Sequence, residues 1–142
     1  MSEIYINIGS NLGERRALIG LACSMLARRL APARMLLSDF VESEPWGFAS
    51  PHPFINRGVL IFTGKDIDPM ALLDITQDIE RTIGHGASHR NADGSYRDRA
   101  IDIDIIDIDN QHLNTERLTL PHPHAEERLF VMEPWRELKA ML

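Results

Sequence analysis

Two aspartates in the stretch "RDRAIDIDIIDIDN", residues 97–110, are the side chains best suited to chemistry. Isoleucine and aspartate alternate between Ile101 and Ile106, which predicts a strand with one apolar face and with Asp102 and Asp104 on the other. Residues on one face of a strand lie about 6.5 to 7 Å apart at Cα. Both carboxylates can therefore reach one small volume, where they repel each other unless a cation lies between them.

Divalent-metal and phosphate chemistry would use such a carboxylate pair. Mg²⁺ typically binds one or two carboxylates together with substrate phosphates. Two such ions, about 3.5 to 4 Å apart, hold both oxygens of an in-line phosphoryl displacement. The alternative is a solvent-facing strand whose negative charges discourage pairing with another sheet edge. The D-x-D motif alone does not decide between the two interpretations.

Arginines precede the aspartates in the chain. Of the 15 basic residues, 13 are arginine, and Arg81, Arg90, Arg97 and Arg99 fall within 19 residues. The guanidinium group binds phosphate through two parallel hydrogen bonds, so the pattern is compatible with a local phosphate site, although solvated surface arginines explain it equally well. The net charge of −6 argues against general affinity for nucleic acid.

Two other metal-dependent sites fit the sequence poorly. His122 and His124 in "LPHPH" have a spacing that could hold zinc, but no cysteine or third clear ligand accompanies them. Nucleotidyltransferases of the polymerase type combine a Gly-Ser pair with a D-x-D strand about a dozen residues later. Here Gly9-Ser10 precedes Asp102 by about 90 residues, so that interpretation fails on spacing.

The elements that must position these residues follow from hydrophobic periodicity and turn residues. A length of 142 residues fits one domain, residues 1–142, without an internal repeat or linker. The order β-α-β-β-α-β predicts an α+β fold of the ferredoxin-like type. Its antiparallel sheet would carry two helices on one face and loops plus a short C-terminal helix on the other. The expected strands are Ile4–Ile8, Met35–Ser43, Ile55–Thr63 and Ile101–Ile106, and the expected helices run from Asn11 to about Leu30, from Asp68 to Gly84, and from about Glu126 to Leu138.

The helix ends rest on capping residues. Asn11 with Glu14 resembles a capping box, and Asn11 either only caps the helix or also contacts a ligand. Gly9 would permit the sharp turn into this helix. Asp68, followed by proline, is the expected N-cap of the second helix, and Gly84 ends it.

Composition also indicates a compartment. The single cysteine, Cys23, rules out an internal disulfide framework. No signal peptide is visible at the start, and no apolar run approaches the roughly 20 residues of a membrane helix. We therefore expect a cytoplasmic monomer that acts on small molecules, with neither membrane nor nucleic acid as a partner.

Several ordered motifs together resemble one family, the 6-hydroxymethyl-7,8-dihydropterin pyrophosphokinases of folate biosynthesis. They are "IGSN" after the first strand, "FIN" opening the third, "TQDIE" in the second helix, "RAIDIDII", "NTERLTLPH" and "RLFV". The resemblance runs nearly end to end. It implies Mg²⁺-dependent transfer of diphosphate from ATP to the hydroxymethyl group of 6-hydroxymethyl-7,8-dihydropterin, with release of AMP.

The resemblance also implies roles for individual residues. Asp102 and Asp104 match the ligands of two Mg²⁺ ions, and Arg99 matches a cation of the site. The loop arginines of bacterial members have no fixed counterpart in this chain, and Arg90 is the loop arginine available as a catalytic cation. Segments 44–53 and 85–98 would be lids that exclude water from the transfer. The positions that match ATP contacts are Gln77, Glu80, Arg99, Arg117, Leu118, Thr119, His122 and Arg128. The positions that match pterin contacts are Phe54 and Phe130 as the aromatic pair, with Ser43, Trp46 and Asn56 at the ring edge.

A non-catalytic alternative exists for this fold. The β-α-β-β-α-β plan also serves ligand-sensing modules and degenerate paralogues. Such a protein would need no paired aspartates, whereas this chain has both, together with Gln77, Glu80 and His122. Release of AMP from ATP only when the hydroxymethyl pterin is present would distinguish an enzyme from a sensor.

Overall fold

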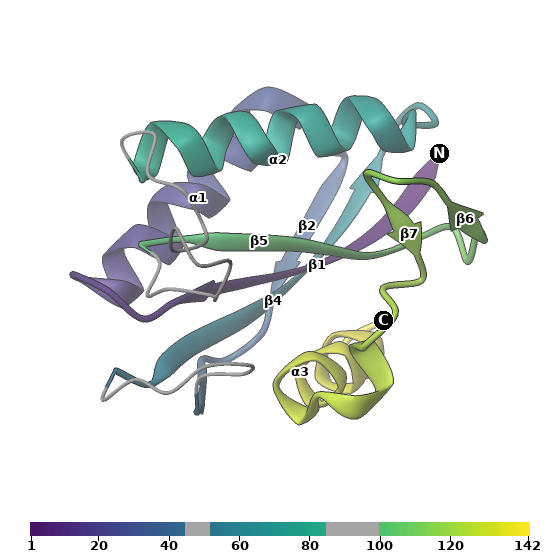
Figure 1. Ribbon diagram of the computed structural model, residues 1–142. Helices are drawn as coiled ribbons and strands as arrows, with labels where there is room; N and C mark the ends of the chain where they lie inside the picture. The colour runs from purple at the N-terminus through teal and green to yellow at the C-terminus, as the bar shows by residue number, and fades with distance from the viewer. Residues whose placement is uncertain (45–51, 85–99) are drawn as a thin grey trace.

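A computed structural model describes residues 1–44, 52–84 and 100–142 (Figure 1). The elements run in the order strand, helix, two short strands, strand, helix, strand, with a small hairpin and a third helix at the end. They are β1 (Ser2–Ser10), α1 (Arg15–Leu30), β2 (Arg34–Leu37), β3 (Val41–Ser43), β4 (Phe54–Thr63), α2 (Pro69–Ile83), β5 (Asp102–Ile108), β6 (Leu113–Asn114), β7 (Thr119–Leu120) and α3 (Leu129–Ala140).

The main sheet is antiparallel and has the strand order β2-β4-β1-β5, with β3 also pairing with β4. Figure 1 shows α1 and α2 on one side of this sheet and α3 on the other. This arrangement confirms the predicted α+β fold with a ferredoxin-like core. It leaves β5, the aspartate strand, at the edge of the sheet.

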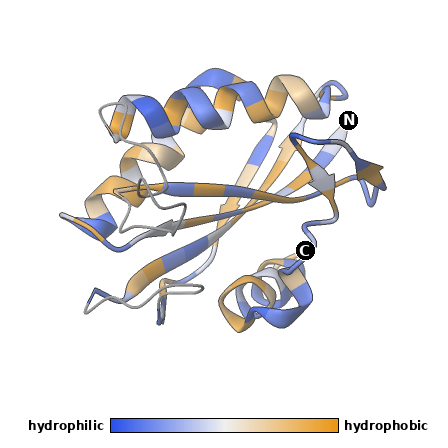
Figure 2. Ribbon diagram, viewed as in Figure 1, coloured by the Kyte–Doolittle hydropathy of each residue, from blue (hydrophilic) through white to orange (hydrophobic). Residues whose placement is uncertain are grey.

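Each face of the sheet buries its own apolar cluster. Ile4, Ile6 and Ile8 of β1 are fully buried in the cluster that α1 and α2 cover. Tyr5, on the opposite face, belongs to a smaller cluster that includes Val131 of α3. The alternation of apolar and polar residues along the strands is visible in Figure 2. Burial of each large side chain stabilises the fold by about 1.5 to 3 kcal/mol, so β1 holds both layers together.

A β-bulge interrupts the aspartate strand. Ile6 pairs with Ile105 but Tyr5 pairs with Asp107, so Ile106 is an extra residue in β5. The predicted alternation holds from Asp102 to Ile105, and the strand continues two residues beyond its predicted end. The bulge therefore lies beyond the two aspartates that the alternation placed together.

The predicted start of the first helix was wrong. α1 begins at Arg15, and its N-cap residue, Glu14, makes no capping hydrogen bond with its side chain. Asn11 instead donates its amide to the carbonyl of His52 at 3.1 Å. The turn is made by Gly13 at φ +75°, because β1 continues through Gly9 to Ser10. Gly9 is therefore not the turn residue that the sequence suggested.

The second helix was predicted correctly. The Asp68 carboxylate accepts a hydrogen bond from the backbone N–H of Ala71 at 3.1 Å, and proline stands at the first helical position. Gly84 ends the helix through its N–H bond to Glu80. The Asp68 carboxylate thereby satisfies one of the N–H groups that the start of a helix leaves without a partner.

Two other boundaries differ from prediction. The expected strand 35–43 is divided into β2 and β3, because the buried Ser38 hydroxyl accepts the backbone N–H of Gly58 at 2.8 Å and interrupts the ladder. The C-terminal segment forms a 3₁₀ turn at Ala125–Glu127 before α3 begins at Leu129.

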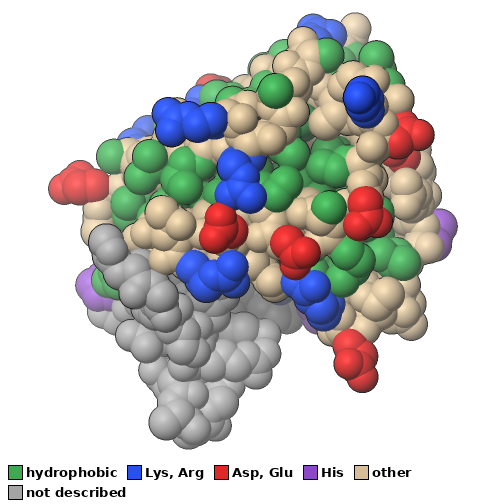
Figure 3. Space-filling view, turned by 90° about the horizontal axis from the view of Figure 1, so that it is seen from above, with side chains coloured by type: hydrophobic (Ala, Val, Ile, Leu, Met, Phe, Trp, Pro, Cys, Tyr) green, Lys and Arg blue, Asp and Glu red, His purple; other side chains and the backbone are tan. Residues whose placement is uncertain are grey.

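The side covered by the helices carries acidic and basic side chains intermingled, as the view from above shows (Figure 3). No helix within residues 1–44, 52–84 and 100–142 is long and apolar enough to cross a bilayer.

α3 packs so closely on the sheet at Gly58 that no side chain fits there. A Cβ atom at this position would lie 2.8 Å from Cβ of Pro134 and 2.8 Å from the Tyr5 hydroxyl oxygen. Gly58→Ala should therefore lower the free energy of unfolding by about 1 to 3 kcal/mol through overpacking. Urea denaturation measures the change.

Gly20→Ala in α1 is the matched control. A Cβ atom there meets nothing within 4 Å, so alanine should stabilise the helix by about 0.5 to 1 kcal/mol. Equal effects of the two substitutions would contradict the close contact between α3 and β4.

Candidate active site

The two aspartates lie on the face of β5 that the two long helices leave open. In the antiparallel register Asp102 stands opposite Gly9 and Asp104 opposite Asn7. The Asp104 side chain is 27% exposed, so its carboxylate remains reachable by a ligand. The structure thus places the two carboxylates on one face, as the alternation predicts.

A hollow of about 120 Å³ lies over these residues, between the sheet and the start of α3. It brings together residues from β1, β3, β4, β5 and the segment that leads into α3. The predicted site residues that line it are Ser43, Phe54, Asn56, Asp102, Asp104, His122, Arg128 and Phe130. Two further lining residues, Asn7 and Gly9, were not predicted to belong to the site, and Glu44 is the first residue of a predicted lid.

Gly9 gives this hollow its depth. A Cβ atom at Gly9 would lie 2.9 Å from the Asn56 Oδ1 and 3.2 Å from a ring carbon of Phe54. Glycine therefore lets the amide and the ring approach the sheet. The sequence could have placed Gly9 in the site. Asn7 and Gly9 alternate with the buried isoleucines of β1, so they must share the opposite face of the strand.

Asn56 is held in one orientation by its own hydrogen bonds. Its Nδ2 donates to the Ser43 hydroxyl at 2.7 Å and to the carbonyl of Val41 at 3.1 Å. Both donors of the amide are occupied, which leaves Oδ1 as the atom that can accept from a ligand. That oxygen lies over Gly9, inside the hollow.

A second hollow, of about 240 Å³, runs along the outer edge of β5. It is lined by Ile103, by Arg117 to Thr119 and by Pro123, and it shares Asp104 and His122 with the first hollow. Three residues predicted from the resemblance as nucleotide contacts (Arg117, Leu118 and Thr119) thus lie on the far side of Asp104 from the aromatic pair. The two hollows meet at Asp104 and His122.

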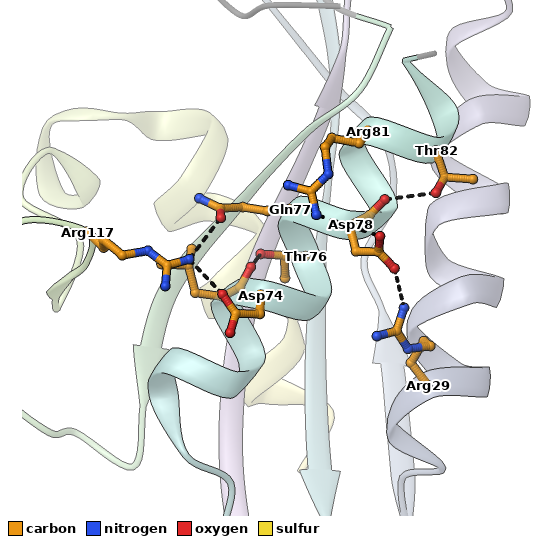
Figure 4. A network of polar contacts seen from close by, with 9 residues as sticks. Arg29, Asp74, Thr76, Gln77, Asp78, Arg81, Thr82 and Arg117 are labelled. Carbon is orange, nitrogen blue, oxygen red and sulfur yellow. Dashed lines mark hydrogen bonds and ion pairs between the residues drawn. The ribbon is translucent and has the colours of Figure 1, made fainter. Parts of the chain in front are cut away.

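Polar contacts tie α2 to this edge of the sheet (Figure 4). Arg117 donates to the Asp74 carboxylate at 2.7 Å and to the side-chain amide oxygen of Gln77 at 3.0 Å. Farther along α2, a carboxylate oxygen of Glu80 accepts the backbone N–H of Ile103 at 2.8 Å. These contacts hold Gln77 and Glu80 close to the edge strand, although neither residue lines the second hollow.

Arg128 and His122 surround the carboxylates with donors. The Arg128 Nη1 lies 3.8 Å from an Asp104 oxygen. Burial, followed by the nearby Arg128 and His124, lowers the pKa of His122 to about 4. The neutral ring accepts the His124 backbone N–H at Nδ1 over 3.2 Å. The ring proton must then be on Nε2, which makes His122 a hydrogen-bond donor near neutral pH.

The two carboxylates fit a hard divalent cation. In the part of the chain that the structure describes, no group of three or more His, Cys, Asp or Glu residues is placed to enclose a metal ion. Mg²⁺ does not require such a group, since substrate phosphates and water complete its octahedral shell. Asp102 and Asp104 therefore suit a metal ion that binds together with a phosphorylated ligand.

A third hollow, of about 410 Å³, lies beyond the Pro121–Pro123 segment and includes Asp107 and Trp135. It is larger than the other two, but of the predicted site residues it contains only His122. Size alone does not locate chemistry: Asp102 and Asp104 both line the first hollow, and Asp104 also lines the second.

Some predicted site residues cannot be placed. Trp46, Arg90 and Arg99 lie in segments 45–51 and 85–99, outside the described residues. The predicted lid 85–98 lies entirely in these segments, and of the predicted lid 44–53 only residues 44, 52 and 53 are described.

Comparison with known proteins decides the family. A family model described as 7,8-dihydro-6-hydroxymethylpterin-pyrophosphokinase matches residues 5–140. The chain belongs to this family. A Porphyromonas gingivalis protein named 2-amino-4-hydroxy-6-hydroxymethyldihydropteridine pyrophosphokinase is 41% identical over 100% of this chain and 94% of its own length. A Bacillus subtilis protein of the same name is 34% identical over 94% of this chain and 76% of its own.

The fold recurs in a solved structure of a pyrophosphokinase. The crystal structure of Plasmodium falciparum HPPK-DHPS superimposes with a TM-score of 0.62 at 13% sequence identity. The match covers 92% of this chain and 39% of that one. At this identity the likeness establishes the shared fold alone.

The depressed pKa of His122 predicts a pH dependence of stability. The unfolded chain binds this proton with the ordinary pKa of 6.5 and the folded chain with a pKa of about 4. Between these two values the unfolded chain binds the proton and the folded chain does not. The contribution of His122 to the free energy of unfolding is therefore fully present above pH 6.5 and is lost as the pH falls toward 4. In an NMR titration the His122 ring should remain neutral at pH 5.5, and His122→Asn should reduce the loss of stability in this window. A His122 midpoint near 6.5 would contradict the burial of this ring.

Proposed function

We propose that this chain transfers the terminal diphosphate of ATP to the hydroxymethyl oxygen of 6-hydroxymethyl-7,8-dihydropterin and releases AMP. Membership of the pyrophosphokinase family supports the reaction class. The observation that carries the assignment of the site is the meeting of two hollows at Asp104 and His122. One hollow would receive the acceptor and the other the nucleotide, with the carboxylates between them.

The first hollow suits a flat heterocycle. Phe54 and Phe130 come from β4 and α3 and line it from different elements, as a stacking pair requires. The Asn56 Oδ1 is positioned to accept an N–H of the ring, since both of its Nδ2 donors are already used. We place the pterin here, with Ser43 and Trp46 at its polar edge.

The second hollow would take the nucleotide, and ATP is the co-substrate of this family. Leu118 and Thr119 would border the base or ribose, with Arg117, Gln77 and Glu80 at the rim. The triphosphate would then extend toward Asp104, where the Nε2–H of His122 and the Arg128 guanidinium can donate to phosphate oxygens.

The transfer itself needs positioning and charge stabilisation. The acceptor oxygen attacks the β-phosphorus and loses its hydroxyl proton to water, the bond between that phosphorus and the α–β bridging oxygen breaks, and AMP leaves with that oxygen. Asp102 and Asp104 would hold two Mg²⁺ ions, which when bound neutralise charge on the phosphates. Arg90 and Arg99 would supply further cations, and segments 44–53 and 85–98 would act as lids over both substrates. The monomeric state and the cytoplasmic location remain predictions from the sequence.

The assay that tests this function measures AMP formed from ATP with and without the hydroxymethyl pterin. AMP should appear only when the pterin and Mg²⁺ are both present. Asp102→Asn and Asp104→Asn should each lower turnover by several orders of magnitude with the fold retained, because charge stabilisation dominates phosphoryl transfer.

Asp107→Asn on the same strand is the control. Asp107 accepts the backbone N–H of Asn110 at 3.1 Å and faces the third hollow. An amide oxygen can replace that acceptor, so turnover should remain near that of the unaltered chain. Ligand binding without any AMP would instead indicate the sensing module, and equal losses in all three variants would remove the metal assignment.

Phe130 tests the pterin hollow separately. Phe130→Ala should weaken pterin binding by about 1 to 3 kcal/mol through lost apolar contact and stacking. The affinity for a non-hydrolysable ATP analogue should change much less. Isothermal titration calorimetry measures both, with Leu129→Ala as the control, since the neighbouring Leu129 is 67% exposed. Equal losses for the two ligands would place the pterin elsewhere.

A further inference from the structure

Asn7 is a buried amide in the middle of β1, between the buried side chains of Ile6 and Ile8. It is 2% exposed, and it lines the first hollow opposite Asp104. A buried amide is costly unless it is hydrogen-bonded. Neither the family resemblance nor the proposed reaction gives this residue a role.

Asn7 donates to the backbone carbonyl of Phe130, which Pro134 leaves without a hydrogen-bond donor inside α3. Within α3 the Phe130 carbonyl should accept the backbone N–H four residues later, but that residue is Pro134, which has none. The Asn7 Nδ2 donates to this carbonyl instead, at 2.9 Å. Because a carbonyl only accepts, the amide orientation follows from the bond.

The neighbouring groups reinforce this contact. Two residues earlier on the same face, the Tyr5 hydroxyl donates to the Val131 carbonyl at 2.7 Å. Across the sheet Asn7 pairs with Gly58, whose missing side chain makes room for Pro134. The first turn of α3 is therefore fixed to β1 at two consecutive carbonyls.

We propose that Asn7 is a positioning residue that holds Phe130 over the pterin hollow. This inference rests on the proposed function. The residue whose carbonyl Asn7 holds carries the ring, and the strand residue opposite Asn7 is Asp104. One amide thus fixes the aromatic wall relative to the carboxylates. Without it, Tyr5 still anchors Val131, but the residue that carries the ring loses its own bond to the sheet.

A purely structural role would be to satisfy the Phe130 carbonyl, and Pro134→Ala separates that role from positioning. Alanine at 134 restores an N–H that can bond the carbonyl within the helix, while the bond to β1 stays absent in an Asn7→Ala background. The double variant Asn7→Ala/Pro134→Ala should therefore recover stability relative to Asn7→Ala without recovering the position of the ring.

The experiment measures pterin affinity, ATP-analogue affinity, kcat, KM and thermal stability in the unaltered chain, both single variants and the double variant. Asn7→Ala should weaken pterin binding about tenfold, which corresponds to the effect of one hydrogen bond, and should raise the pterin KM more than it lowers kcat. ATP-analogue affinity should stay within about twofold. The double variant should regain thermal stability and keep the weakened pterin affinity.

Three outcomes would overturn the proposal. Recovery of pterin affinity together with stability in the double variant would make Asn7 structural only. Unchanged pterin affinity in both Asn7 variants, with normal binding by the unaltered chain, would reject the positioning role and leave the proposed function intact. Failure of the unaltered chain to bind the pterin would reject the hollow and this inference together. If Asn7→Ala alone does not fold, the double variant compared with Pro134→Ala gives the same affinity comparison.

Discussion

The pairing of β1 with β4 on one side and β5 on the other is the constraint on which the site depends. In this register Gly9 lies between Asn56 and Asp102, and Asn7 lies between Gly58 and Asp104. A shift of one residue would turn the carboxylates toward the isoleucine cluster and the isoleucines toward the hollow. The buried isoleucines of β1 therefore specify the position of the aspartates, although they touch no ligand.

The open face is completed by α3, which contributes both an apolar lid for Tyr5 and one wall of the first hollow. Pro134 of α3 packs against Gly58 of β4. The Phe130 carbonyl, which Pro134 leaves without a donor within the helix, accepts a hydrogen bond from the Asn7 side chain of β1. Beside this wall, a neutral histidine and an arginine stand near two carboxylates. Donors and acceptors are thus arranged around the point where the two hollows meet.

Much of this arrangement could be predicted from the sequence. Alternating residues placed Asp102 and Asp104 on one face, and the order of elements gave the fold, because period and burial are local properties of a strand. The capping prediction for Asn11 failed because the length of β1, set by its pairing with β4, moved the turn to Gly13. Local sequence contains no signal of that pairing.

The roles of Gly9 and Asn7 depend on still longer-range contacts. Each is explained by a residue at least 45 positions away, Asn56 for Gly9 and Phe130 for Asn7. The bulge at Ile106 was also hidden, since an apolar residue there fits either face. The carboxylates could be predicted from composition and spacing. The residues that form the cavity around them could be identified only in the folded chain.

The proposed arrangement brings the pterin to Asp102 and Asp104 from the first hollow and the nucleotide to Asp104 from the second. A crystal structure of the chain with Mg²⁺, a non-hydrolysable ATP analogue and the hydroxymethyl pterin tests it most directly. The pterin should lie between Phe54 and Phe130, and the nucleotide should lie along the edge of β5 with its phosphates at Asp104. A nucleotide bound in the hollow beside Trp135, or a pterin outside the aromatic pair, would contradict the account.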